Sequence, residues 1–108
     1  MNLARVHARL EFLKLINWKA ITSASVSPAD SSATKVFGSE FFCEAYRLLL
    51  EVFGSSGMLR GRGDAPLRGR LERAYQGTLF LTFGGGTNEV QRDLIALFGL
   101  GMPRVPRH

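Results

Sequence analysis

Three consecutive glycines, Gly84–Gly86, followed by Thr87, form the stretch of this sequence best suited to binding chemistry. The apolar segment "TLFLTF" at 78–83 leads into them, and an amphipathic segment follows. A glycine turn before a helix presents backbone N–H groups at the positive end of the helix dipole, where phosphate can bind. A tight structural turn is an equal alternative on physical grounds, although one glycine would suffice for it. Neither the P-loop ending Gly-Lys-Ser/Thr nor the dinucleotide spacing G-x-G-x-x-G occurs here.

The other side chains that could do chemistry are scattered. Glu40, Glu44 and Glu51 lie along one predicted helix, where a solvated face explains them better than a buried base does. Cys43 is expected to be a small core residue. The two histidines and the one cysteine are far apart in the sequence and make no metal-ligand set. The sequence therefore predicts no metal site and no nucleophile triad.

The chain is basic, with a formal charge of +5, and much of this charge lies between residues 60 and 73. Asp64 and Glu72 offset part of it. A basic cluster suits a phosphate-bearing partner, and nucleic acid, a nucleotide cofactor and a CoA thioester are all candidates. A solvated basic loop is an equal alternative. The arginines of the cluster are Arg60, Arg62, Arg68, Arg70 and Arg73.

Apolar spacing predicts two long helices. Residues 3–21 repeat apolar side chains at helical spacing, over so much of the circumference that neighbours are expected on more than one side. A second helix begins at Pro28, with Ser27 as its N-cap, and ends before Gly54. Gly38 inside this helix is expected to mark a close helix crossing, because glycine costs about 1 kcal/mol against alanine there.

Two shorter helices complete the predicted fold. One begins just after Asp64, which can cap it. Residues 75–83 have the composition of a strand but no partner strand, so helix or turn is expected there. The last helix begins at Thr87 or Asn88 and ends before Gly99. The predicted fold class is an all-α antiparallel bundle of two long and two shorter helices.

Length and composition fit one globular domain, with 108 residues of which 45% are hydrophobic. The single cysteine excludes an intrachain disulfide and fits a reducing, cytoplasmic setting. The longest uninterrupted apolar runs, such as "LLL" at 48–50, are far too short to span a bilayer.

Three segments, in order along the chain, resemble the C-terminal helical domain of the acyl-CoA dehydrogenase family. "GGTNEVQRDLIALFGLG" at 85–101 is similar to the family's E-G-T-(S/N)-(Q/E)-I-Q-R motif. "LLLEVFGSSGM" at 48–58 is similar to Q-(I/V)-x-G-G-x-G, and "DAPLRGRLERAY" at 64–75 to P-(L/V)-x-(R/K)-x-x-R-D. The resemblance covers residues 1–103 and leaves 104–108 as a basic tail. "TFGGGTNEVQRD" and "GLGMPR" look most like actinobacterial members, including those that act on steroid side-chain thioesters.

The resemblance implies an FAD enzyme that oxidises an acyl-CoA thioester to the α,β-enoyl-CoA. In the family a glutamate removes the α-proton and the β-hydrogen passes to the flavin as hydride. Subunits also carry an N-terminal helical domain and a β-domain, and their C-terminal bundles pack together in tetramers. The implied partners are therefore acyl-CoA and further acyl-CoA dehydrogenase subunits, in a homo-oligomer or a heterotetramer, without nucleic acid.

Two groups of residues match positions that contact flavin in the family. The first would lie along the FAD of a neighbouring subunit and comprises Glu51, Val52, Phe53, Gly54 and Ser55. The second would contact the FAD bound to its own chain and comprises Thr87, Asn88 and Glu89. Gly86 would face the substrate.

Gly85 stands where many members of the family carry the catalytic glutamate. Glycine has no proton acceptor, so no catalytic residue is assigned in this chain, and Glu89 matches a flavin-contacting position instead. The leading prediction is an acyl-CoA dehydrogenase C-terminal domain that supplies flavin and oligomer contacts and is inactive alone. A non-catalytic subunit that completes the flavin site of a full-length enzyme is one alternative. A basic module that binds polyanions is another.

Overall fold

The computed structural model describes residues 1–58, 66–104 and 106, and these are helical or irregular without a strand. The all-α prediction is therefore confirmed for the described residues. The elements, in order along the chain, are α1 (Asn2–Thr22), α2 (Pro28–Phe53), the 3₁₀ turn η1 (Gly54–Met58), the 3₁₀ turn η2 (Pro66–Gly69), α3 (Arg70–Thr78), α4 (Asn88–Leu94) and the π-helical turn η3 (Ile95–Gly99).

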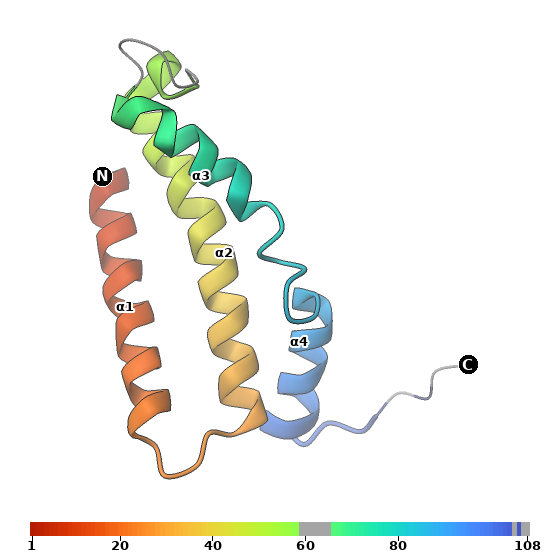
Figure 1. The fold of residues 1–108 in the computed structure, drawn as a ribbon. Helices are drawn as coiled ribbons and strands as arrows, with labels where there is room; N and C mark the ends of the chain where they lie inside the picture. The colour runs from red at the N-terminus through yellow and green to blue at the C-terminus, as the bar shows by residue number, and fades with distance from the viewer. Residues whose placement is uncertain (59–65, 105, 107–108) are drawn as a thin grey trace.

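Helix α2 is the centre of the fold (Figure 1). Helix α1 runs antiparallel to it on one side, while α3 and α4 follow each other along its other side. The molecule is consequently flat, with principal extents of 54 × 37 × 21 Å. This arrangement leaves α1 with α2 as its main neighbour, and it brings the turn before α4 against the middle of α2.

The predicted helix boundaries on α2 and α4 are confirmed. Ser27 Oγ accepts a hydrogen bond from the backbone N–H of Asp30 at 3.0 Å, and Gly54 ends α2 with a φ of +61°. Thr87 caps α4, and its Oγ1 accepts from the N–H of Val90 at 3.3 Å. Side-chain caps of this kind satisfy N–H groups that the first helical turn leaves free.

Helix α3 begins later than the sequence predicts. Asp64, the expected cap, lies outside the described residues, and the 3₁₀ turn η2 precedes the α-helix, which starts at Arg70. Leu67 and Gly69 have positive φ values of +50° and +72°, which are incompatible with right-handed helix. These two backbone conformations delay the helix, and Leu67 stays exposed while Leu71 is buried.

A small core cluster lies between α1 and α2. Leu13, Phe41 and Ala45 form a buried cluster. Partly buried apolar side chains surround it, namely Val6, Leu10, Ile16 and Phe37. The opposite side of α1 remains open, because Leu15, Trp18 and Ile21 are 66%, 64% and 77% exposed. The neighbours expected on more than one side of this helix are not supplied by the described part of the chain.

Gly38 faces α1 at the helix crossing, but the crossing has room for a methyl group. An added Cβ would meet Leu13 Cδ1 at 3.6 Å, an ordinary van der Waals distance. We therefore expect Gly38→Ala to raise the free energy of unfolding by about 0.5–1 kcal/mol, because alanine has the higher helix propensity. Urea denaturation measures it. Gly77→Ala, in α3 with no atom near the added Cβ, is the matched control and should gain a similar amount. A loss confined to Gly38→Ala would mean that the crossing requires glycine.

Candidate functional site

The glycine turn before α4, residues 84–87, is the candidate site. Gly85 and Gly86 have φ values of +69° and +95°, a region that side-chain-bearing residues rarely adopt. Both glycines are exposed, so their backbone is open to a ligand or a neighbouring chain. Two of the three glycines are thus required by conformation, and a turn with this much exposed backbone admits close approach from outside.

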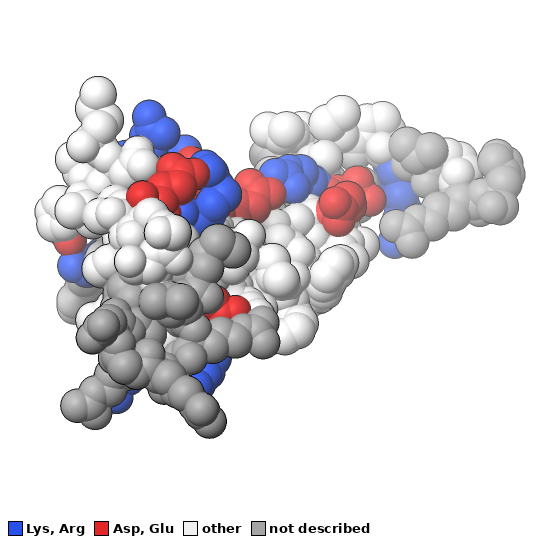
Figure 2. Space-filling model, turned by 90° about the horizontal axis from the view of Figure 1, so that it is seen from above, with Lys and Arg blue, Asp and Glu red and all other residues white. Residues whose placement is uncertain are grey.

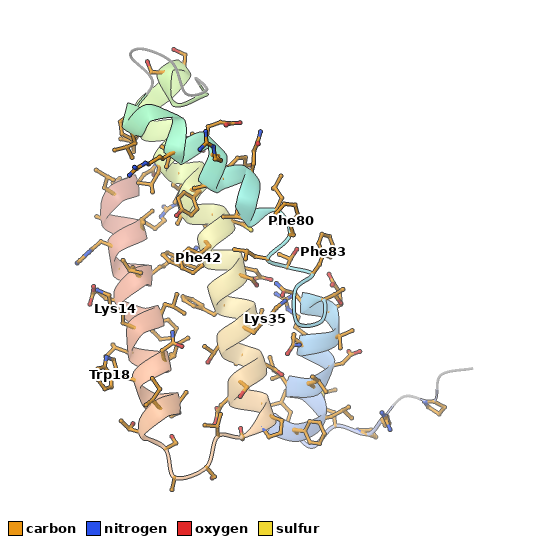
Figure 3. The ribbon with its side chains drawn as sticks, viewed as in Figure 1. Lys14, Trp18, Lys35, Phe42, Phe80 and Phe83 are labelled. Carbon is orange, nitrogen blue, oxygen red and sulfur yellow. The ribbon has the colours of Figure 1, made fainter. Side chains whose placement is uncertain are left out.

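Lys35 lies on the side of α2 that faces the turn before α4 (Figure 3). Its Nζ donates to the carbonyl oxygen of Thr82 at 3.2 Å and to that of Gly86 at 2.9 Å. It donates a third hydrogen bond to Asn88 Oδ1 at 2.6 Å. An ammonium group has three donors, and these three acceptors use all of them.

Asn88 is the centre of a buried polar cluster, with only 4% of its surface exposed. Its Nδ2 donates to Ser39 Oγ at 3.1 Å and to Glu40 Oε1 at 3.3 Å. Its backbone N–H donates to the carbonyl oxygen of Thr82 at 3.1 Å. Arg92 donates to the same Glu40 oxygen at 2.6 Å. The polar groups of Asn88 are therefore engaged within the chain, and its side chain is not presented to a ligand.

The N-terminus of α4 retains few free donors for an anion. The N–H of Asn88, its first residue, is bonded to Thr82, and that of Val90, its third, is bonded to the Thr87 hydroxyl. The next N–H, of Gln91, donates to the Thr87 carbonyl. The phosphate site considered for this stretch would thus depend on the glycine backbone more than on the helix end.

The other predicted flavin-contacting group, residues 51–55, lies at the far end of α2. All five residues are exposed, and Glu51 accepts hydrogen bonds from Arg47 and Asn2. Fourteen residues separate Phe53 from Ser39, the residue of α2 bonded to Asn88, which corresponds to about 21 Å along the helix. The structure therefore does not bring the two predicted groups together within one chain.

Lys35, Ser39 and Gln91 also belong to the site, although no sequence motif points to them. Gln91 Nε2 donates to the carbonyl oxygen of Gly85 at 2.7 Å, so the turn is held from α4 as well as from α2. A signal was available on α2, where Ser32, Lys35 and Ser39 recur at the spacing of one helix face. Ser32 and Ser39 are buried. Polar residues at buried helical positions indicate a hydrogen-bonded partner segment.

Three of the four acidic side chains of α2 are paired with basic ones, Glu40 with Arg92 among them. Glu44 pairs with Arg9 and Glu51 with Arg47, and Figure 2 shows acidic and basic groups alternating on the face it presents. On α1, the hydrogen bond from Lys14 lowers the pKa of Glu11, and both groups are exposed. Cys43 is half-buried and donates through Sγ to the carbonyl oxygen of Thr78 at 3.2 Å.

Among the described residues, no cluster of three or more His, Cys, Asp and Glu side chains could hold a metal ion. No helix in this part of the chain combines the length and the apolar character that a membrane crossing requires. The arginine cluster of the sequence lies partly outside these residues, since Arg60 and Arg62 are not described.

Comparison with known proteins decides the family. Residues 1–99 match the family model for the C-terminal domain of acyl-CoA dehydrogenase. This chain belongs to the acyl-CoA dehydrogenase family. The acyl-CoA dehydrogenases FadE26 and FadE29 of Mycobacterium tuberculosis are 57% and 40% identical to it, over 99% and 97% of the chain. The chain spans only 28% and 27% of their lengths.

Solved structures of acyl-CoA dehydrogenases share the fold. The ChsE4–ChsE5 complex from Mycobacterium tuberculosis superposes with a TM-score of 0.90 at 59% identity, covering 97% of this chain and 28% of the solved one. The Tcur3481–Tcur3483 steroid acyl-CoA dehydrogenase gives 0.89 at 41% identity, covering 96% and 28%. The bundle described here is therefore the C-terminal domain fold of the acyl-CoA dehydrogenases.

The two left-handed glycines of this acyl-CoA dehydrogenase domain should differ in their tolerance of a side chain. A Cβ on Gly85 would meet no atom within 4 Å, whereas a Cβ on Gly86 would lie 3.0 Å from Gln91 Nε2. We expect Gly85→Ala to lower the free energy of unfolding by about 1 kcal/mol, from backbone strain alone. Gly86→Ala should cost about 2 kcal/mol, because it also displaces Gln91 from the Gly85 carbonyl. Thermal unfolding of the pair tests this, and equal losses would contradict it.

Proposed function

We propose that this chain acts as the C-terminal domain of an FAD-dependent acyl-CoA dehydrogenase and supplies contacts to flavin and to other subunits. The observation that carries the proposal is the exposed glycine turn, with its two left-handed glycines, at the family's flavin- and substrate-contacting position. The rest of the flavin site would come from parts of the enzyme that this sequence does not contain.

The residues around the turn fit a flavin at close range. Gly85 and Gly86 have no side chain to exclude a planar ring system, and Glu89 is exposed beside them. Thr87 and Glu89 would contact the cofactor, and Asn88 would contribute by holding the turn. FAD, when bound, supplies the acceptor for the hydride that leaves the acyl chain. The group at residues 51–55, about 21 Å away along α2, would serve the flavin of a neighbouring subunit.

The catalytic base would come from another element. Gly85 offers no proton acceptor, and its surroundings leave open space where a side chain would project. The proposed substrate is an acyl-CoA, and Gly86 would face it. A steroid side-chain thioester is the finer proposal, because one solved neighbour is described as a steroid acyl-CoA dehydrogenase.

A non-catalytic subunit of a mixed oligomer is the second candidate function. Both solved neighbours are named as assemblies of two different chains, ChsE4–ChsE5 and Tcur3481–Tcur3483. The exposed apolar side chains of α1 and of the segment before the glycine turn favour burial in such an assembly. Four basic side chains pair with carboxylates, which leaves less free positive charge for the polyanion-binding alternative.

The test is purification of the chain through an affinity tag from its own cells. The expected product contains FAD together with an acyl-CoA dehydrogenase polypeptide, either a longer form of this chain or a different subunit. Mass spectrometry separates these two forms of the proposal, and flavin absorbance gives the cofactor content. Recovery of the tagged chain without flavin and without any acyl-CoA dehydrogenase polypeptide would contradict the proposal.

A further inference from the structure

We infer that Lys35 is a positioning residue that fixes the glycine turn in its ligand-binding conformation, with the buried side chain of Asn88 as its second anchor. The inference rests on the proposed function, since it assigns a role in the same site. It assigns that role to an ammonium group of α2 that lies about fifty residues before the turn in the sequence. Lys35 itself touches neither of the ligands proposed for the turn.

The hydrogen bonds of the turn fix the direction of its peptide groups. A trans peptide is planar, so the N–H of a residue points opposite to the C=O of the residue before it. No cis peptide occurs in the described residues. The Gly85 carbonyl accepts from Gln91, and the Gly86 carbonyl accepts from Lys35. Both carbonyls are thus drawn into the chain, which turns the N–H groups of Gly86 and Thr87 outward.

A turn of three glycines needs such an anchor because glycine is the residue with the most conformational freedom. Without a restraint, the turn would populate many backbone conformations, because ordering three glycines has a high entropic cost. Lys35 restrains it at both ends, since Thr82 precedes the glycines and Gly86 is the last of them. All three of its hydrogen bonds go to neutral oxygens, so Lys35 holds the turn without a carboxylate partner.

The anchor is rigid because it is built on α2. Asn88 accepts from Lys35 and donates to Ser39 and Glu40, which lie just over one helical turn further along the same helix. Arg92 of α4 adds a charged contact to Glu40. The turn is thereby fixed to the most central element of the fold, on which a site can be held with precision.

The first test measures the turn without any cofactor. The backbone N–H of Asn88 donates to Thr82, so its hydrogen exchange rate reports on the turn. Ala45 is buried in the core, so the exchange rate of its N–H reports on the whole fold. Lys35→Met is expected to raise the exchange rate of the Asn88 N–H about tenfold or more, because the loss of one charge-assisted hydrogen bond corresponds to a factor of this size. The exchange rate of the Ala45 N–H should not change. Lys14→Met, on the exposed side of α1, is the matched control and should change neither. Unchanged exchange at Asn88 would overturn the inference.

The second test measures flavin in the tagged complex. Lys35→Met should raise the Kd for FAD about tenfold, since the outward N–H groups are no longer held, and Lys35→Arg should recover part of the affinity because it keeps the donors. Lys14→Met should bind FAD as the natural chain does. Unchanged FAD affinity in Lys35→Met would overturn the role in the site. If the natural complex binds no FAD, the proposed function fails, while the exchange measurement still decides whether Lys35 fixes the turn.

Discussion

Replacing Phe41 with alanine is expected to lower the free energy of unfolding by about 3–5 kcal/mol, the range for removing a buried aromatic side chain. Phe41 is only 4% exposed and lies in the cluster with Leu13 and Ala45. Its ring stacks on Phe37 at a centroid distance of 6.2 Å. Small domains have total stabilities near the low end of about 5–15 kcal/mol, so this one change should remove most of the stability. Urea denaturation followed by circular dichroism measures it.

Phe42 provides the matched control for this substitution. It follows Phe41 on the same helix but is 38% exposed, so Phe42→Ala should cost about 1–2 kcal/mol. If the Phe41→Ala chain is unfolded in water, Phe41→Leu keeps most of the buried volume and gives a measurable midpoint. Equal losses from Phe41→Ala and Phe42→Ala would show that the core does not lie where the structure places it.

Most helix boundaries could be predicted because their causes are local. Ser27, Pro28 and Gly54 act on the backbone within one turn of where they stand, and the start and end of α2 follow from them. The late start of α3 was not predictable in this way. It depends on the positive φ of Leu67, a conformation that leucine rarely adopts and that the sequence does not signal.

The contact face of α4 was predicted only in part. Helical spacing predicts that Val90, Leu94 and Phe98 share the apolar side of this helix, but Val90 and Phe98 are 42% and 62% exposed. The face that meets α2 begins with the polar Asn88, which apolar spacing alone cannot find. Further along, the π-helical turn at Ile95–Gly99 departs from the spacing of 3.6 residues per turn and rotates Phe98 away.

The polar anchor of the glycine turn shows the limit of sequence reasoning on the site. Its hydrogen bonds join residues about fifty positions apart, such as Lys35 and Asn88, and no single-sequence pattern encodes such pairing. Motif resemblance found Asn88 because it lies within the matched segment. The resemblance predicts a flavin contact at Asn88, and this role remains a proposal. Because Asn88 is buried, we propose that it holds the turn in position and does not contact the flavin directly.

Replacing Asn88 with alanine is expected to lower the free energy of unfolding by about 3 kcal/mol. The change removes one of the three acceptors of Lys35 and the amide that donates to Ser39 and Glu40. These polar groups then lack a partner at a site that little water can reach, which lowers stability. The glycine turn should loosen at the same time, because Lys35 loses one of its three acceptors. Thermal unfolding measures the stability, and hydrogen exchange in the turn measures the loosening.

Asn17→Ala is the matched control, since Asn17 makes a single hydrogen bond, to the carbonyl oxygen of Leu13 in its own helix. Its replacement should change stability by less than about 0.5 kcal/mol, because alanine has the higher helix propensity and the site is open to water. A large loss from Asn88→Ala with an unchanged glycine turn would assign Asn88 to stability alone. A small loss of stability would mean that water forms hydrogen bonds with the former partners of Asn88. The buried polar cluster would then contribute little to the packing of α4 against α2.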